Sequence, residues 1–188
     1  MITAADHVTF KETDSVLEAL LLESKLIKEN TPPYNTKEKD NKSFTCVVIT
    51  KEKFPRVLTM RIRDFEKRFT KKETLAVYGP FASLIQLKEA MKIIRKMFPF
   101  RDRCDIGQSK PCFNAQIKLC PGVCVGAISE TEYKGHITNI RKLLEGKKTD
   151  IKKSLQKDMN EYAKKHMFEK AAQVRNTLFA LDHIKDVN

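Results

Sequence analysis

The chain has 188 residues and a formal net charge of +12, and 41% of its residues are hydrophobic. This length allows one domain or two small ones with a real core. The sequence has no run of about eighteen apolar residues, which argues against a membrane partner, and its start lacks the pattern of a signal peptide. We therefore expect a cytoplasmic protein, in which stable disulfides are rare.

Lysine and arginine are concentrated in two stretches, 51–72 and 88–103. This pattern favours a polyanion as a partner, because each neutralised phosphate releases counterions. A solvated, lysine-rich surface would give the same composition, and no helix-turn-helix or zinc-finger spacing is present. The side chains expected to contact DNA are Arg56, Arg61, Arg63, Arg95, Lys96 and Arg101.

The first predicted elements are a short strand near Val8 and Phe10 and a helix over 16–29. Ser15 and Glu18 form a capping-box pattern at the start of that helix. Two consecutive prolines at 32 and 33 disfavour its continuation. A polar, lysine-rich loop follows.

Three strands are predicted next, on β-branched and alternating composition, over 44–50, 56–62 and 75–81. The third is expected to end in a Gly-Pro turn. Apolar residues at helical spacing then predict a core-packing helix that begins at Leu84 and stops before Pro99. A capping box at Ser129 opens another predicted helix, over 129–146.

The last forty residues carry two apolar stripes at helical spacing with little room between them. This pattern predicts a C-terminal helical hairpin. Two short helices alone are marginally stable in water, so the hairpin needs a partner in the same chain or in another one. The residues expected to bind a partner are Leu155, Met159, Phe168, Glu169, Ala172, Arg175 and Leu178.

Four of the five cysteines lie between 104 and 124, with the spacing C-x7-C-x7-C-x3-C, at Cys104, Cys112, Cys120 and Cys124. Structural zinc sites usually use two close C-x2–4-C pairs, and only the last pair here is close. An iron–sulfur cluster fits clustered thiolates at least as well. The spacing favours a metal over buried free thiols without choosing iron over zinc. Cys46, within a predicted strand, is expected to be a core residue.

Three segments together resemble the bacterial UvrC family. "LEALLLESKLIKENTPPYN" is similar to the second half of its GIY-YIG nuclease domain, "KPCFNAQIKLCPGVCVGAISETEY" to its cysteine-rich middle, and "LQKDMNEYAKKHMFEKAAQVRNTL" to its UVR motif. The resemblance implies a component of nucleotide excision repair that binds UvrB and damaged double-stranded DNA. It also implies that the four cysteines hold an iron–sulfur cluster, with zinc as the second choice.

The resemblance implies an α+β fold: a GIY-YIG remnant over 1–37, a middle domain over 38–147 with a small antiparallel sheet, helices and the cysteine-cluster loop, and a UVR hairpin over 148–188. Glu23 matches the family's metal-binding glutamate and Asn35 the asparagine of its "PxYN" segment. A carboxylate there would hold a divalent cation such as magnesium. Without the resemblance, Glu23 on a solvated helix face is the simpler interpretation.

The chain departs from the family pattern at the nuclease site. Its first glycine is Gly79, so neither GIY nor YIG is present, and the second nuclease domain of the family is missing as well. We therefore expect no incision by this chain alone. The competing functional class is a non-nuclease adaptor that combines a UVR hairpin with a zinc module, but such modules use C-x2-C pairs, which this sequence lacks.

Overall fold

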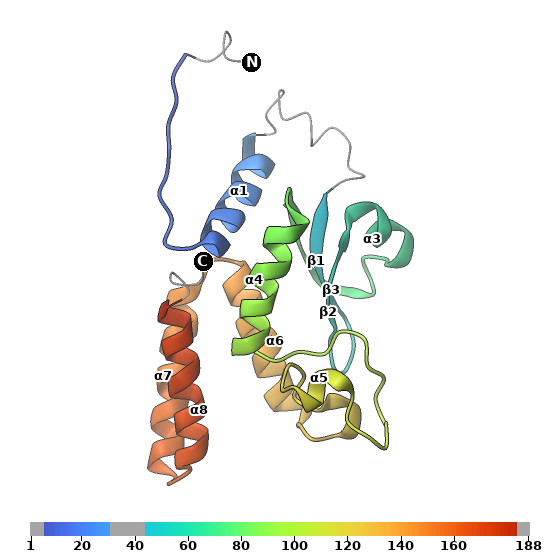
Figure 1. Cartoon of the computed structure of the whole chain (residues 1–188), viewed down its shortest axis with the longest axis vertical. Coiled ribbons are helices and arrows are strands. Elements are labelled where there is room, and N and C mark those ends of the chain that lie inside the picture. Colours follow the sequence, from blue (N-terminus) through green and yellow to red (C-terminus); the bar gives the residue numbers. More distant parts are fainter. Residues whose placement is uncertain (1–5, 31–43, 184–188) are drawn as a thin grey trace.

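The computed structural model describes residues 6–30 and 44–183, and it is an α+β arrangement of helices around a small sheet (Figure 1). The elements follow the chain in this order: α1 Val16–Asn30, β1 Thr45–Thr50, β2 Val57–Arg61, α3 Ile62–Arg68, β3 Thr74–Phe81, α4 Leu84–Met97, α5 Phe113–Gln116, the 3-10 turn η2 Val123–Val125, α6 Glu130–Leu144, α7 Lys148–Lys164 and α8 Phe168–Asp182.

The sheet is antiparallel, with strand order β2-β1-β3. The central strand β1 is buried along its whole length. Because side chains alternate between the two faces of a strand, Val47 and Ile49 point into the main core while Cys46 and Val48 point to the other side. The helix α3 contacts β1 and β2.

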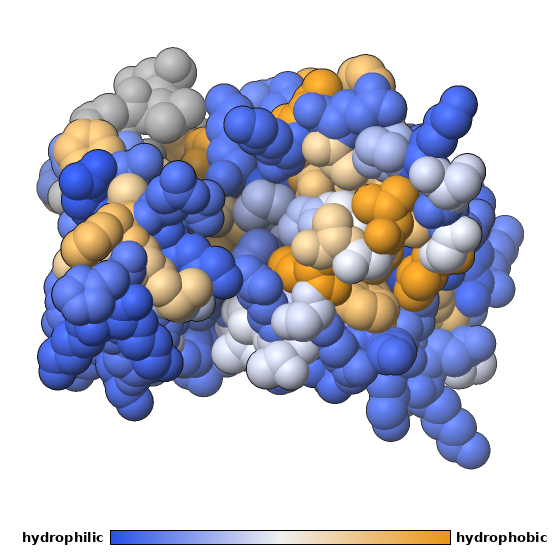
Figure 2. Space-filling view, turned by 90° about the horizontal axis from the view of Figure 1, so that it is seen from below, coloured by the Kyte–Doolittle hydropathy of each residue, from blue (hydrophilic) through white to orange (hydrophobic). Residues whose placement is uncertain are grey.

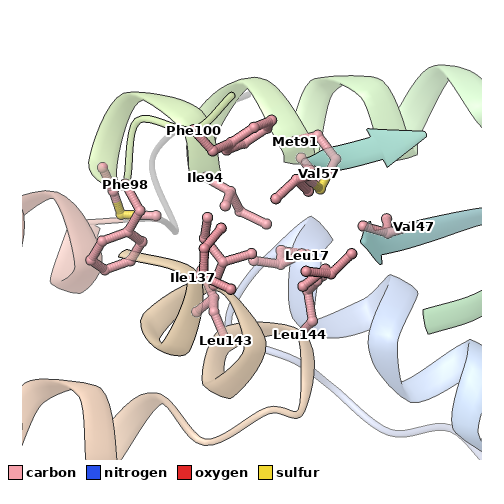
Figure 3. Packing of buried hydrophobic residues seen from close by; sticks show 14 of the residues in the cluster. Leu17, Val47, Val57, Met91, Ile94, Phe98, Phe100, Ile137, Leu143 and Leu144 are labelled. Carbon is pink, nitrogen blue, oxygen red and sulfur yellow. The ribbon is translucent and has the colours of Figure 1, made fainter. Parts of the chain in front are cut away.

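The main core lies between the sheet and helices α1, α4 and α6 (Figure 3). Val47 and Val57 enter it from the sheet, Ile94 from α4 and Ile137 from α6. The apolar stripe predicted for this helix is confirmed as core packing. Of its five residues, Leu84 is half-buried and the others are buried: Leu87, Met91, Ile94 and Phe98. Burying such side chains removes apolar surface from water, which stabilises the fold by about 25 cal/mol per Å².

Helices α7 and α8 form the predicted hairpin, joined by a tight turn in which His166 adopts a left-handed conformation, with φ of 57°. The base of the hairpin packs on the core through Ile151, Leu155 and Leu181, all of which are buried. Its other end carries exposed apolar side chains. Figure 1 shows the hairpin and the 101–128 segment on either side of α6.

Most helix and strand predictions are confirmed, including both helix starts. The hydroxyl of Ser15 accepts a hydrogen bond from the Glu18 amide, and that of Ser129 from the Glu132 amide. The strand near Val8 was wrong, because this segment pairs with no other strand in the described residues, and Val8 is 89% exposed. The Gly-Pro turn was also wrong, since β3 continues through it to Phe81, which pairs with Thr45.

Candidate metal centre and contact surfaces

The segment 101–128, called here the cysteine loop, connects α4 to α6 and contains little regular structure beyond α5 and η2. It brings the thiols of Cys104, Cys112 and Cys120 together, with their Sγ atoms within 4.8 Å of one another. Cys124, which is fully buried, lies beside them and its Sγ accepts a hydrogen bond from the Cys112 amide at 3.3 Å. None of these cysteines forms a disulfide.

The neighbouring thiols and burial shift the pKa values of Cys104, Cys112 and Cys120. Burial and the neighbouring cysteines raise the pKa of Cys104 to about 12. Burial also raises the pKa of Cys120. Burial acts in the same direction on Cys112, but the Ala115 backbone amide and the thiols of Cys124 and Cys104 outweigh it and lower the pKa of Cys112. Four thiols that repel one another's charge need a cation before all can ionise together.

The donor set fits a thiolate-bound metal group. In a tetrahedral zinc site with Zn–S of about 2.3 Å the sulfurs lie about 3.8 Å apart, so the observed spacing accommodates a single ion. A four-iron cluster would use the same four thiolates, but it would need a wider cage because each thiolate would bind a different iron. Backbone amides at Gly122 and Val123 stabilise the Cys120 thiolate, as the N–H groups around metal-bound sulfurs do.

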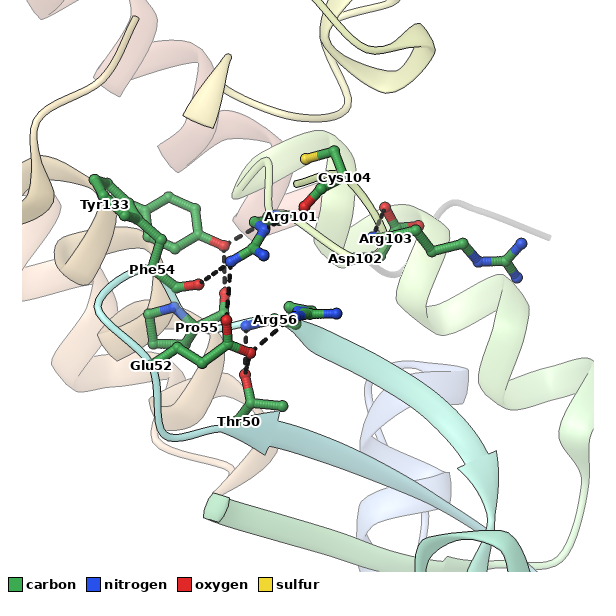
Figure 4. Close-up of polar contacts among 10 residues, drawn as sticks. All are labelled: Thr50, Glu52, Phe54, Pro55, Arg56, Arg101, Asp102, Arg103, Cys104 and Tyr133. Atoms are coloured by element: carbon green, nitrogen blue, oxygen red, sulfur yellow. Dashed lines mark hydrogen bonds and ion pairs between the residues drawn. The ribbon is translucent and has the colours of Figure 1, made fainter. Parts of the chain in front are cut away.

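A buried arginine connects the cysteine loop to the sheet (Figure 4). The Arg101 side chain is only 3% exposed. Its Nε donates to the Cys104 carbonyl at 2.7 Å, and its Nη1 donates to the Phe54 carbonyl at 2.8 Å and to Glu52 Oε2 at 3.1 Å. Because a buried guanidinium needs partners for its N–H groups, Arg101 fixes the position of the first cysteine relative to the β1–β2 turn.

Tyr133 of α6 completes this network from the other side. Its hydroxyl donates to the Pro55 carbonyl at 2.6 Å and accepts from the Arg101 amide at 2.9 Å. Burial raises its pKa well above the usual value. The turn, the loop and α6 therefore share one hydrogen-bond network beside the thiols.

A second arginine holds the other part of the loop. Arg95 of α4 donates from Nε to the Leu119 carbonyl at 2.8 Å, next to Cys120, and from Nη2 to the Phe100 carbonyl at 3.0 Å. Its Nη1 pairs with Asp102 at 2.9 Å. Two arginines thus bind the backbone at or beside two of the cysteines.

These contacts correct part of the predicted DNA surface. Arg95 and Arg101 are internal partners of the loop, so their guanidinium groups are not free for phosphates. Arg56 is half-buried and pairs with Glu52 at 3.0 Å. The remaining predicted side chains are exposed: Arg61, Arg63 and Lys96.

Glu23 lies on an exposed position of α1, next to the buried Ser24. Among the described residues it belongs to no group of three or more metal-ligating side chains. Asn35 lies outside the described residues. The Glu23 side chain is therefore open to solvent on α1, and its assignment as a remnant of the family's metal site stays a prediction.

The predicted partner-binding residues of the hairpin divide into two groups. Leu155 is buried in the core, and Leu178 packs against it from a half-buried position. Phe168, at 65% exposed, leads the outer group, which also contains Met159, Glu169, Ala172 and Arg175. Phe179, which was not among the predicted residues, is 64% exposed and stacks on His183.

Sequence reasoning missed Glu52 and Tyr133 as parts of the site. Glu52 lies 52 positions before Cys104, and Tyr133, although it closes the segment that resembles the family, gives no local signal that its hydroxyl would reach this network. Within the described residues, no helix combines the length and apolar character needed to cross a bilayer.

The chain matches known families over most of its described length. Residues 44–143 match the middle domain of the UvrC/Cho excinuclease, and residues 149–184 match the UvrB/uvrC motif. The first match covers more than half of the sequence, so the chain belongs to the UvrC/Cho excinuclease family.

Curated relatives carry the name UvrABC system protein C. The one from Clostridium kluyveri is 40% identical over 194 residues, covering 97% of this chain and 30% of the relative. The one from Caldicellulosiruptor saccharolyticus is 36% identical over 178 residues, covering 92% of this chain and 29% of the relative. That from Methanosarcina acetivorans is 34% identical over 186 residues, covering 99% and 34%. The chain thus spans about a third of the length of these relatives. No solved structure matches it.

Proposed function

We propose that this chain is a UvrC-like component of bacterial nucleotide excision repair, acting in the cytoplasm. It binds UvrB through the hairpin over 148–188 and damaged double-stranded DNA through the middle domain over 38–147. The observation that carries the proposal is the UVR hairpin itself, whose base is anchored in the core while Phe168 near the turn remains 65% exposed.

The hairpin surface suits a second amphipathic hairpin as its partner. Phe168 offers a large apolar side chain, and a buried aromatic is the usual anchor of a small interface. The half-buried Ala172 on the same helix allows a partner helix to approach closely. Exposed Glu169 and Arg175 provide charges of both signs, which set the orientation of a partner more than the affinity.

Lysines on the outer side of α7 favour an acidic partner. A groove of about 740 Å³ runs along this helix, and Lys152, Lys153, Lys157 and Lys164 are among the residues that line it. Lys152 already pairs with Asp182 of α8. The other three are exposed or partnered only within α7, and their charge would speed the encounter with an acidic partner surface.

DNA binding rests on the basic side chains that remain exposed, Arg61, Arg63 and Lys96. These contacts would be made to phosphates and would carry little sequence preference. The affinity should therefore fall steeply as salt is raised.

For the four cysteines we propose an iron–sulfur cluster, with zinc as the second choice. The resemblance of the cysteine segment supports iron. The clustering of the thiols supports a metal site, which would have to widen to hold a cluster in place of a single ion. The cluster would join an irregular loop to the helices beside it, and its binding energy would contribute to folding. Protein purified without oxygen should be brown and contain iron and sulfide.

The chain alone should not cut DNA. Segment 1–37 supplies Glu23 and Asn35 as remnants of a GIY-YIG site, and magnesium at Glu23 would require the first half of that domain. A metal ion without the tyrosine and arginine of that half lacks the groups that activate the nucleophile and stabilise the phosphate. Magnesium-dependent nicking that disappears in Glu23→Ala would contradict this proposal.

The alternative is a zinc-containing adaptor with no role in incision. It shares the UVR hairpin, and the single-ion spacing of the thiols is compatible with it. Colourless protein with stoichiometric zinc, together with a hairpin that does not bind UvrB, would favour the adaptor.

The direct test is calorimetric titration of the full chain with purified UvrB. We expect a micromolar complex that Phe168→Ala weakens by roughly 2–4 kcal/mol, which is enough to abolish it. Because Phe168 is mostly exposed, its removal should leave the Tm of the full chain unchanged. Absence of binding by the unsubstituted chain, or a lowered Tm with unchanged binding, would overturn the docking proposal.

A further inference from the structure

The cysteine loop exposes apolar side chains beside the candidate metal centre. Phe113 is 72% exposed, Ile106 is 50% exposed and Ile117 is 47% exposed. Figure 2 shows hydrophobic side chains gathered on this side of the molecule, away from the hairpin. A clustered, exposed apolar surface on an otherwise charged protein marks a contact site more often than chance.

These side chains are held in place by the loop that carries them. Phe113 directly follows Cys112, and Ile106 lies two residues after Cys104. The backbone therefore ties both residues to cysteines of the cluster. The Ile117 amide donates to the Phe113 carbonyl at 3.2 Å, which places these two residues one helical turn apart on the same side of α5.

A hydrogen bond from its Asn114 side chain holds α5 in place. The Asn114 side chain donates to Asp102 Oδ1 at 3.0 Å, and the other oxygen of that carboxylate pairs with Arg95. Phe113 therefore projects from an anchored segment. Presenting it in this orientation costs little ordering entropy when a partner binds.

The charges around this apolar group are mostly positive. Arg103, Lys110 and Lys118 are exposed, and Arg103 points away from the buried network in Figure 4. Between 101 and 128 the acidic residues are Asp102 and Asp105, and Asp102 is neutralised by Arg95. Three exposed cations against one exposed acid favour an anionic partner, such as the phosphates of a nucleic acid, over a neutral or basic apolar surface.

An exposed aromatic ring with surrounding cations is the combination that binds unpaired nucleotides. The ring stacks on a base, and the cations contact the phosphates on either side. Bases in an intact duplex are already stacked on both faces, so a projecting phenylalanine finds a free base face only where pairing is lost.

We propose that the cysteine loop is a binding site for unpaired nucleotides, in which Phe113 stacks on a base, Ile106 and Ile117 extend the apolar surface, and Arg103, Lys110 and Lys118 contact phosphates. This inference rests on the proposed role in DNA repair and assigns a local DNA structure to one surface of the chain. A metal at the clustered thiols would hold the surface in shape.

The test measures fluorescence anisotropy of the full chain with three labelled probes: a duplex, the same duplex with a short central unpaired bubble, and a single strand. We expect tighter binding to the bubble and the single strand than to the duplex. Phe113→Ala should lose roughly tenfold or more of the affinity for unpaired DNA, the range for one stacked base, while Phe113→Trp should retain it.

Phe179→Ala is the matched control, because Phe179 is 64% exposed but lies on the hairpin. It should bind all three probes as the unsubstituted chain does. Metal content and Tm should be unchanged in Phe113→Ala, which separates the lost contact from a damaged loop.

Three results would overturn the inference. The first is equal affinity for bubble and duplex, which leaves general DNA binding and the proposed function intact. The second is a Phe113→Ala variant that weakens duplex and bubble binding by the same factor. The third is a variant that binds all DNA normally but no longer binds UvrB, which would make the loop a protein-docking surface.

Discussion

The hairpin over 148–183 and the cysteine loop over 101–128 maintain their structures by different means. The hairpin is regular, and the burial of Ile151, Leu155 and Leu181 fixes it to the core. The loop has few regular hydrogen bonds and depends on clustered thiols and on two arginines that bind its carbonyls. Periodic burial explains the first region, whereas specific polar contacts and thiols that could hold a metal explain the second.

The comparison predicts the largest effect for loss of a thiol. Cys120→Ser should abolish stoichiometric metal binding, because the remaining three thiolates leave one position without a protein sulfur. Metal analysis and the absorption spectrum of protein purified without oxygen measure this loss. The matched control is Cys46→Ser, which replaces the buried β1 cysteine outside the cluster and should keep the metal. Equal metal content in Cys120→Ser and the unsubstituted chain would remove Cys120 from the ligand set.

Removing the buried arginine should have the next largest effect. Arg101→Met leaves Glu52 Oε2 and the carbonyls of Phe54 and Cys104 without this donor. Breaking a fully buried ion pair costs about 3–5 kcal/mol, and we expect less here because Glu52 is 31% exposed and keeps Arg56 as a partner. Urea unfolding with a metal assay should show lower stability and faster metal loss to a chelator. Arg103→Met, at an exposed position, should change neither quantity. A stable Arg101→Met variant with normal metal retention would show that the cysteine loop keeps its structure without the Arg101 contacts.

The hairpin should respond to loss of apolar volume at its base. Leu181→Ala creates a cavity at a fully buried position and should lower the free energy of unfolding by about 2–4 kcal/mol. Phe179→Ala, two residues away and mostly exposed, should have little effect on thermal unfolding. If both variants lose the same stability, the buried and exposed faces of α8 do not differ as the burial pattern indicates.

The smallest expected effect is on the way stability falls at acidic pH. Burial raises the pKa of Glu52, but the Thr50 hydroxyl and the charges of Arg56 and Arg101 outweigh it and hold the pKa below its usual value. A carboxylate whose pKa is lowered by folding contributes stability above its unfolded pKa of about 4.3 and loses it as the pH falls through the folded value.

Glu52→Gln should therefore reduce stability by about 1–2 kcal/mol at pH 7. The difference from the unsubstituted chain should shrink as the pH falls below about 4, where the carboxylate becomes protonated. Denaturant midpoints measured from pH 7 to pH 3 provide the test. A constant difference across this range would show that the charge of Glu52 contributes nothing.

The same contrast explains what could be predicted from the sequence. Periodic apolar residues and capping signals predicted α1, α4, α6 and the hairpin, because each depends on neighbours within a few positions. The short helices α3 and α5 were not predicted. Cys46 was correctly predicted as a core residue from its place in a β-branched strand. The strand at Val8 failed because pairing depends on a distant strand, which local alternation does not reveal.

At the candidate site, the arginines show where prediction from the sequence fails. Arg95 and Arg101 lie in a basic stretch, and composition alone assigned them to DNA. The structure instead pairs Arg101 with Glu52, which is 49 positions away, and directs Arg95 to a carbonyl beside Cys120. The cysteine spacing indicated a metal site, but the residues that support it, including Tyr133, depend on tertiary packing.

Hydrogen exchange of the full chain, with and without a strong metal chelator, tests the division between the two regions most directly. Exchange reports local opening, so a segment held by metal should lose protection once the metal is removed. We predict faster exchange in 101–128 and unchanged protection in α7 and α8. Protection that falls equally in both regions, or that remains in the cysteine loop after complete metal removal, would contradict the account.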